Sequence, residues 1–144
     1  MEDFMMRMME LSMQSYGCSQ ILLLMRLEAD GEENPGLIRA MGGLLGGMGF
    51  TGGTCGALTG GACMIGYYAA KGAPEERQDS KLNSMVTELV EWFEVEYGGQ
   101  YGGTDCSCIM CGDLGNRMAR CPPIIEAVYF KCLDILEENG YELN

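Results

Sequence analysis

Eight cysteines are the side chains of this 144-residue sequence best suited to chemistry. Cys106, Cys108 and Cys111 follow the pattern C-x-C-x-x-C, and nine residues separate Cys111 from Cys121. Four thiolates at such short spacing can bind zinc or an iron–sulfur cluster. Spacing alone therefore indicates a local metal site made of these four cysteines.

Three cysteines are predicted at helix starts, namely Cys18, Cys55 and Cys121. The free N–H groups and the positive end of the helix dipole at such positions stabilise a thiolate, which is the form that binds metal. In contrast, Cys63 and Cys132 fall within predicted helices among apolar residues. We expect these two to be buried packing residues, because that is the common role of an isolated cysteine.

The sequence contains no histidine. This excludes the usual general base of Ser/His and Cys/His catalysis and every imidazole ligand for a metal. A thiol–disulfide oxidoreductase stays open, because Cys108 and Cys111 form a C-x-x-C pair. Thioredoxin chemistry, however, normally places that pair after a strand in a βαβ unit, and no such unit is predicted here.

Glycine is concentrated on both sides of Cys55, in the segment GGLLGGMGFTGGTCGALTGGACMIG over residues 42–66. The Leu, Met, Ala and Cys residues between the glycines are typical of a protein interior. Glycine permits positive φ and has no side chain, so it is used where backbone turns sharply or approaches another group closely. We therefore expect a bound group or a second helix to lie against this segment.

Apolar residues at helical spacing, with Asn-Pro, Cys-Pro-Pro and glycine pairs as boundaries, predict most of the elements. The predicted helices cover about residues 2–14, 18–28, 35–41, 55–70, a span from Pro74 or Ser80 to Gly98, and 121–140. Residues 101–120 show little periodicity, and no period-2 run predicts a strand. The sequence thus predicts an all-α fold, one compact domain of five to six helices over residues 1–144, with a buried glycine-rich segment. The 13 methionines are expected to pack its core.

The net charge of −12, from 21 acidic and nine basic residues, is expected to repel nucleic acid and anionic membranes. The uncharged stretch 40–70 is long enough to cross a bilayer, but its many glycines add little transfer free energy, so a buried helix is the better interpretation. The first residues are acidic where a signal peptide is basic, which predicts a cytoplasmic protein. Clustered cysteines in that compartment indicate metal binding or thiol chemistry.

The segments around four of the cysteines resemble a known family. They read Gly17-Cys18-Ser19-Gln20, then Cys55-Gly56-Ala57-Leu58-Thr59-Gly60, then Cys106, then Cys121-Pro122. This pattern resembles that of the redox-active proteins called the C_GCAxxG_C_C family, and the resemblance covers nearly the whole chain. A related domain in split-Soret cytochromes is understood to carry an iron–sulfur cluster on cysteines of this kind.

The resemblance implies that four cysteines hold an iron–sulfur cluster. The implied ligands are Cys18, Cys55, Cys106 and Cys121. A [2Fe–2S] cluster is favoured by the resemblance to the split-Soret domain, although four cysteines also serve a [4Fe–4S] cluster. The additional cysteines depart from the family pattern and leave open whether Cys108 or Cys111 replaces Cys106.

The resemblance also gives the glycines around Cys55 a chemical role. Glycine at positions 52, 53 and 56 would let backbone N–H groups approach the sulfurs of a cluster, so we expect Gly52, Gly53 and Gly56 to border the cofactor. The alternative is that these glycines only let two helices pack closely.

The preferred interpretation is a small iron–sulfur protein that transfers electrons or senses redox state, without a substrate pocket of its own. It would act with a redox partner protein, and it is expected to be a non-catalytic carrier rather than an enzyme. The alternatives are a thiol–disulfide oxidoreductase using Cys108 and Cys111 and a structural zinc-binding interaction domain. The oligomeric state is left open, with a homodimer as one alternative.

Overall fold

The computed structural model describes residues 2–144, and 68% of the chain is helical. Its α-helices are α1 (Glu2–Met13), α2 (Cys18–Ala29), α3 (Pro35–Met41), α4 (Gly56–Ala69), α5 (Leu82–Phe93), α6 (Gly99–Tyr101), α7 (Cys106–Met110) and α8 (Arg117–Glu138). Two 3₁₀ turns, η1 (Gly42–Leu44) and η3 (Leu114–Asn116), and a π-helical turn, η2 (Glu94–Gly98), connect them. No strand occurs between residues 2 and 144, so the prediction of an all-α fold is confirmed.

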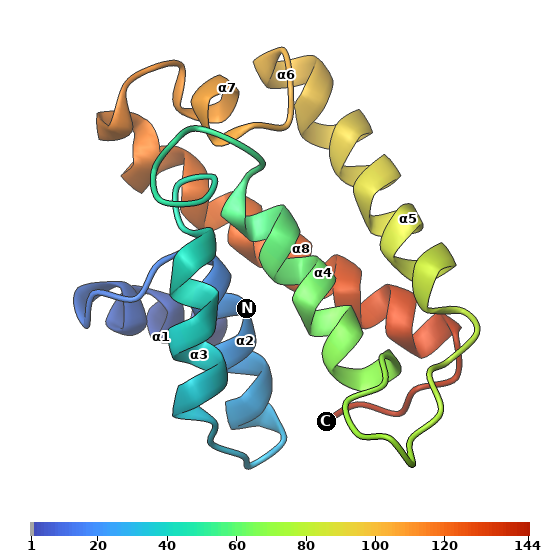
Figure 1. Ribbon diagram of the computed structural model, residues 1–144. Helices are drawn as coiled ribbons and strands as arrows, with labels where there is room; N and C mark the ends of the chain where they lie inside the picture. Colours follow the sequence, from blue (N-terminus) through green and yellow to red (C-terminus); the bar gives the residue numbers. More distant parts are fainter. Residues whose placement is uncertain (1) are drawn as a thin grey trace.

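Helix α4 lies at the centre of the molecule, with α5 on one side, α2 and α3 on the other and α8 behind it (Figure 1). Two glycines of α4 allow this close packing. A β-carbon at Gly60 would lie 2.9 Å from Ser19 Cα of α2, and one at Gly61 would lie 2.6 Å from Val128 Cγ1 of α8. Close helix packing therefore accounts for these two glycines of the glycine-rich segment.

Most apolar faces of the helices form one large core around α4, and a smaller cluster of Leu23, Leu27, Ile38 and Met41 lies between α2 and α3. In α5, Met85, Leu89 and Phe93 recur at four-residue spacing and are buried, as the amphipathic pattern predicts.

Asn34 caps α3, because its Oδ1 accepts a hydrogen bond of 3.1 Å from the Leu37 N–H, and Pro35 takes the first helical position.

Two expectations, the number of helices and the burial of the glycine-rich segment, are not met in full. The prediction of five to six helices is too low, since seven are present besides the three-residue α6. The extra helix, α7, is only five residues long, too short to show a helical period in sequence. Most residues of the glycine-rich segment from Cys55 onwards are buried, with Cys63 exposed, but Met48 and Phe50 in its first half are exposed.

Gly98 and Gly99 do not stop the helix that contains α5, contrary to the prediction. The chain continues through η2 and α6 and turns away only at Gly102, which has a φ of 78°. Glycine inside a helix costs only about 1 kcal/mol, so packing can override it. Here the Tyr97 ring packs 4.9 Å from that of Phe93 and supports the continuation.

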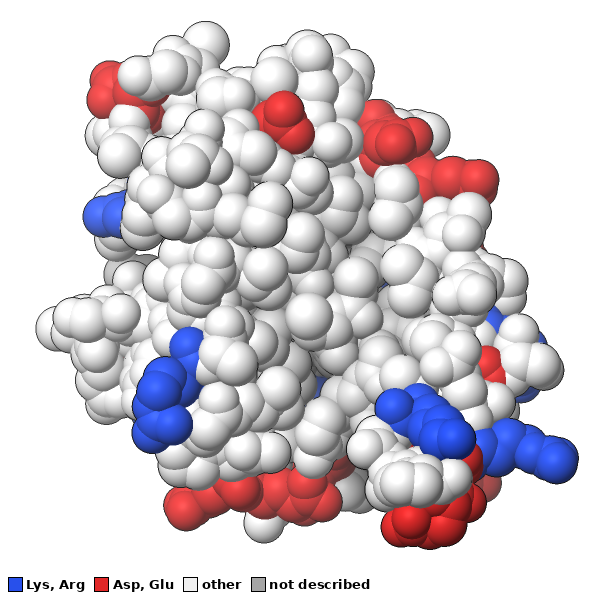
Figure 2. All heavy atoms as spheres, in the orientation of Figure 1, with Lys and Arg blue, Asp and Glu red and all other residues white. Residues whose placement is uncertain are grey.

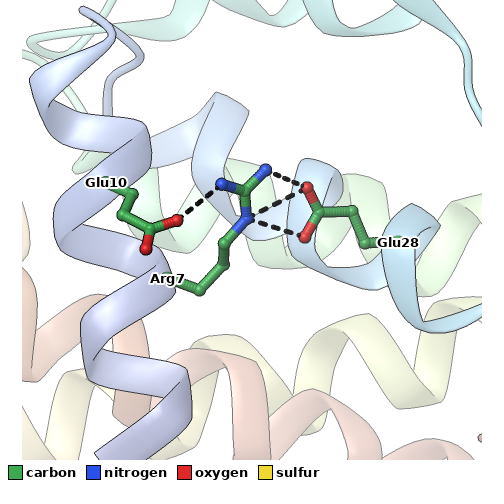
Figure 3. Close-up of polar contacts among 3 residues, drawn as sticks. All are labelled: Arg7, Glu10 and Glu28. Carbon is green, nitrogen blue, oxygen red and sulfur yellow. Dashed lines mark hydrogen bonds and ion pairs between the residues drawn. The ribbon is translucent and has the colours of Figure 1, made fainter.

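Helix α1 is joined to α2 by a group of exposed charges (Figure 3). Arg7 Nη1 lies 2.9 Å from Glu10 Oε2 in the same helix, and Arg7 Nε donates to Glu28 Oε2 in α2 at 3.1 Å. Both carboxylates raise the pKa of Arg7. The contact ties α1 to the last turn of α2.

The acidic residues are unevenly distributed over the visible surface. Figure 2 shows Asp and Glu side chains along the lower edge and at the upper left and upper right, whereas the middle of this face carries few charges. In the part of the chain that the structure describes, no helix combines the length and apolar character needed to cross a membrane.

Candidate functional site

Four cysteines from distant parts of the chain meet at the end of the molecule where the glycine-rich loop lies. Cys18 begins α2, Cys55 directly precedes α4, Cys106 begins α7, and Cys121 lies in α8. All four pack against the same cluster of buried residues, and each lies close enough to others of the set to influence their pKa values. The fold thus brings together the residues that the family resemblance singled out.

An isolated antiparallel bridge between Thr54 and Asp105 places two of these cysteines side by side. The Cys55 N–H donates to Thr104 O at 3.1 Å, and the Cys106 N–H donates to Gly53 O at 2.6 Å. Because each cysteine follows a bridged residue, the starts of α4 and α7 are held next to each other.

Gly56 lies directly against a cysteine sulfur. A β-carbon at this position would lie 2.5 Å from Cys18 Sγ, closer than real β-carbons approach other atoms, and 3.2 Å from Leu44 O, which is a tight contact. Any larger residue would therefore displace the Cys18 side chain or the loop before α4. The close approach expected beside Cys55 is made here by the sulfur of Cys18.

Gly52 and Gly53 act through their backbone. Gly52 has a φ of 84°, and its N–H donates to Gly46 O at 3.0 Å, while the Gly53 N–H donates to Gly47 O at 3.1 Å. The carbonyl groups of the two glycines accept from the first N–H groups of α7, including that of Ser107 at 3.2 Å. These glycines therefore fix the position of α7, and a direct contact with a cofactor stays a prediction.

Burial controls the ionisation of the four thiols. It raises the pKa of Cys55 to about 12 and that of Cys18 and Cys121 to about 11, and it also raises the pKa of Cys106. The Ala57 N–H at the start of α4 opposes the rise at Cys55. The thiols are therefore neutral at pH 7 in the metal-free protein, and forming their thiolates requires a compensating cation.

Cys121 does not lie at a helix start, contrary to the prediction, because α8 begins four residues earlier at Arg117. Tertiary contacts extend the helix backwards, since Asn116 Nδ2 donates to Met110 O at 2.7 Å and Arg120 Nη1 donates to Ile109 O at 2.5 Å. The same two hydrogen bonds tie the first turn of α8 to α7, which carries Cys106. They therefore bring Cys121 towards Cys106.

The remaining cysteines divide into buried and peripheral ones. Cys132 is fully buried, as expected, and its thiol donates to Gly61 O at 3.5 Å. Cys63 is exposed on α4, so the expectation that it packs in the core is wrong. Cys108 is half-buried and Cys111 is exposed. Neither packs against the core cluster that contains the four converging cysteines.

The four sulfurs converge without a closed ligand geometry. Among residues 2–144, no group of three or more Cys, Asp or Glu side chains is arranged as a site that could hold a metal ion. The ligand set Cys18, Cys55, Cys106 and Cys121 thus stays a prediction.

A cavity of about 480 Å³ opens next to the site, although the sequence predicted no pocket. Cys18, Cys106 and Cys121 line it, together with Arg117. Sequence reasoning missed Arg117, because the start of α8 was placed after it. With the helix start known, the i, i+4 spacing of Arg117 and Cys121 places both on one face.

Residues 16–135 match the sequence model of a family described as Putative redox-active protein (C_GCAxxG_C_C). The chain belongs to the C_GCAxxG_C_C family. The matched range includes all four converging cysteines and the glycine-rich segment. The part of the chain that matches this redox-active family therefore contains the cysteine site described above. No curated protein and no solved structure matches the chain.

Proposed function

We propose that this protein binds an iron–sulfur cluster through Cys18, Cys55, Cys106 and Cys121 and uses it to transfer single electrons or to sense redox state. The observation that supports the proposal most directly is the convergence of these four cysteines from four separate segments. Membership of a redox-active family agrees with it. We favour a [2Fe–2S] cluster, because of the resemblance to the domain in split-Soret cytochromes.

The donor chemistry suits such a cluster. The chain has no histidine, and thiolates are the ligands on which iron–sulfur clusters are normally built. Cys55 is only 8% exposed, and apolar residues surround the four sulfurs. Gly56 keeps the space beside Cys18 Sγ free of any side chain.

Each part of the chain would have a defined task. The four cysteines would bind the irons, and the free N–H groups at the starts of α2 and α4 would stabilise the thiolates. The apolar core cluster would limit access of water to the sulfurs. A bound iron–sulfur cluster would supply reversible one-electron chemistry, with a potential tuned by these N–H groups and by burial.

The test is purification without oxygen, followed by iron and acid-labile sulfide analysis, visible absorption and electron paramagnetic resonance of the reduced protein. We expect iron and sulfide in stoichiometric amounts and a spectrum that bleaches on reduction. Serine substitution of Cys18, Cys55, Cys106 or Cys121 should abolish or shift that spectrum. Cys63→Ser is the matched control, because Cys63 is exposed on α4.

Stoichiometric zinc without sulfide would overturn the proposal and leave the structural zinc domain as the better interpretation. A metal-free protein that reduces disulfides would instead favour the oxidoreductase. If the cluster survives both Cys18→Ser and Cys55→Ser, the proposed function would stand, but the proposed ligands would be wrong.

A further inference from the structure

The cavity beside the cysteines has the size of a small-molecule site. Its volume of about 480 Å³ falls within the range of roughly 300–1,000 Å³ that is usual for ligand pockets. Its walls come from α1, the turn before α2, the start of α2, the glycine-rich loop, α7, η3 and the first part of α8. Cys18, Cys106 and Cys121 line it, whereas Cys55 does not.

Large apolar side chains surround this cavity and remain exposed. Those that both line it and are exposed are Met9 (43%), Phe50 (53%), Leu114 (54%) and Met118 (59%). They come from α1, the glycine-rich loop, η3 and α8, so no single amphipathic helix explains their grouping. Exposed apolar groups that gather around a hollow commonly mark a binding site, and methionine adapts to ligands of different shape. These residues also correct the expectation that the methionines serve only to pack the core.

The charge of the cavity is opposite to that of the protein. Although the chain carries 21 acidic and nine basic residues, Arg117 is the one charged residue that lines the cavity in the part of the chain that the structure describes. The four ion pairs among the described residues involve other side chains. A second cavity of the same volume is lined by Glu28, Glu32 and Glu33 as well as by Arg39. The cavity beside the cysteines differs because, among the residues that the structure describes, no acidic side chain lines it together with Arg117.

We propose that the cavity binds a small apolar molecule that carries one carboxylate. The planar guanidinium of Arg117 can donate two parallel hydrogen bonds to a carboxylate, and a single arginine suits one negative charge. The apolar body of the ligand would lie against Met9, Phe50 and Met118. The bound molecule would thus lie next to Cys18, Cys106 and Cys121. Such a ligand site is an addition to the proposed function, which needs no pocket.

Isothermal titration calorimetry of the isolated protein with decanoate and decanol tests this assignment. Both probes have the same apolar chain, but only decanoate is charged. Because a hydrogen bond to a charged group contributes about 1.5–3 kcal/mol, decanoate should bind at least about tenfold more tightly than decanol. Arg117→Gln should remove this preference, while Arg77→Gln, in the loop after α4, should retain it.

A second variant locates the binding. Ser12 lines the cavity from α1, so Ser12→Trp should fill it and weaken both probes at least tenfold in a protein whose circular dichroism is unchanged. Equal affinities for decanoate and decanol, or a preference that survives Arg117→Gln, would overturn the proposal. Binding that is unaffected by Ser12→Trp would do the same.

Iron and sulfide analysis of the same samples separates this proposal from the function proposed above. Protein without a cluster that binds decanoate through Arg117 would contradict only the iron–sulfur proposal. Protein with an intact cluster and no preference for decanoate would contradict only the ligand site.

Discussion

Gly56 and Cys18 are in such close contact that no side chain fits between them, because a β-carbon on Gly56 would lie 2.5 Å from Cys18 Sγ. The two residues begin different helices, α4 and α2, so this contact fixes where the two helix starts meet. It also explains why a glycine follows Cys55 in this chain.

Gly56→Ala should therefore displace the Cys18 sulfur. The protein should still fold, but the cysteine site should be impaired. We expect overpacking to cost about 1–3 kcal/mol of unfolding free energy and the visible spectrum to be lost or shifted. Gly66→Ala in the same helix is the matched control, since a β-carbon there would have no atom within 4 Å. Urea denaturation and anaerobic absorption spectra measure both effects, and equal spectra in the two variants would argue against a role for Gly56 at the site.

Cys108→Ser and Cys111→Ser should leave the visible spectrum unchanged. Neither residue packs against the core cluster or lines the cavity, whereas Cys106 does both. In the native protein, the exposed Cys111 should also react with a thiol reagent before Cys55, which is buried. Loss of colour in Cys108→Ser, with retention in Cys106→Ser, would show that the local cysteine pattern supplies the third ligand.

The metal-free protein should lose stability above pH 9. The pKa of Cys55 is 9.0 in its ordinary environment and is raised by burial to about 12 in the fold, so the folded state favours the neutral thiol. This contribution is complete below pH 9 and is lost as the pH rises towards 12, which amounts to a loss on the order of 2 kcal/mol by pH 11. Urea denaturation in reductant at pH 7.5 to 11 measures it.

Cys55→Ala is the variant that isolates the contribution of Cys55, because it should make the pH dependence less steep, while the other buried thiols with raised pKa, such as Cys18 and Cys121, keep theirs. Cys111→Ala, at an exposed position, should retain the slope of the native protein. A slope that is the same in all three proteins would show that Cys55 is not the group responsible.

Arg7→Ala should lower the unfolding free energy by no more than about 1 kcal/mol, because the ion pairs with Glu10 and Glu28 are partly exposed. The loss should shrink at high salt, where exposed charges are screened. Thermal unfolding at low and high salt checks this expectation, with Arg77→Ala as the control. A loss well above 2 kcal/mol would mean that the attachment of α1 depends on this contact far more than its exposure suggests.

The sequence by itself determined the elements with a strong local signal. Helical spacing and caps place α1 to α5 to within a few residues, since side chains on one face of a helix recur every three to four positions. The signal fails at α7, which is shorter than two turns, and at the start of α8. Both depend on contacts between distant segments, such as the bridge of Thr54 with Asp105 and the hydrogen bond from Asn116 to Met110.

The cysteine site shows the same division. The sequence contained two sets, the local Cys106, Cys108, Cys111 and Cys121 and the set implied by resemblance, and spacing favoured the first. Only the tertiary structure decides which thiols meet, because proximity in a helical protein is set by how the helix starts pack and not by separation along the chain. The cavity and the availability of Arg117 could not be predicted either. The cavity is lined by side chains from many separate segments, whose relative positions no local pattern encodes.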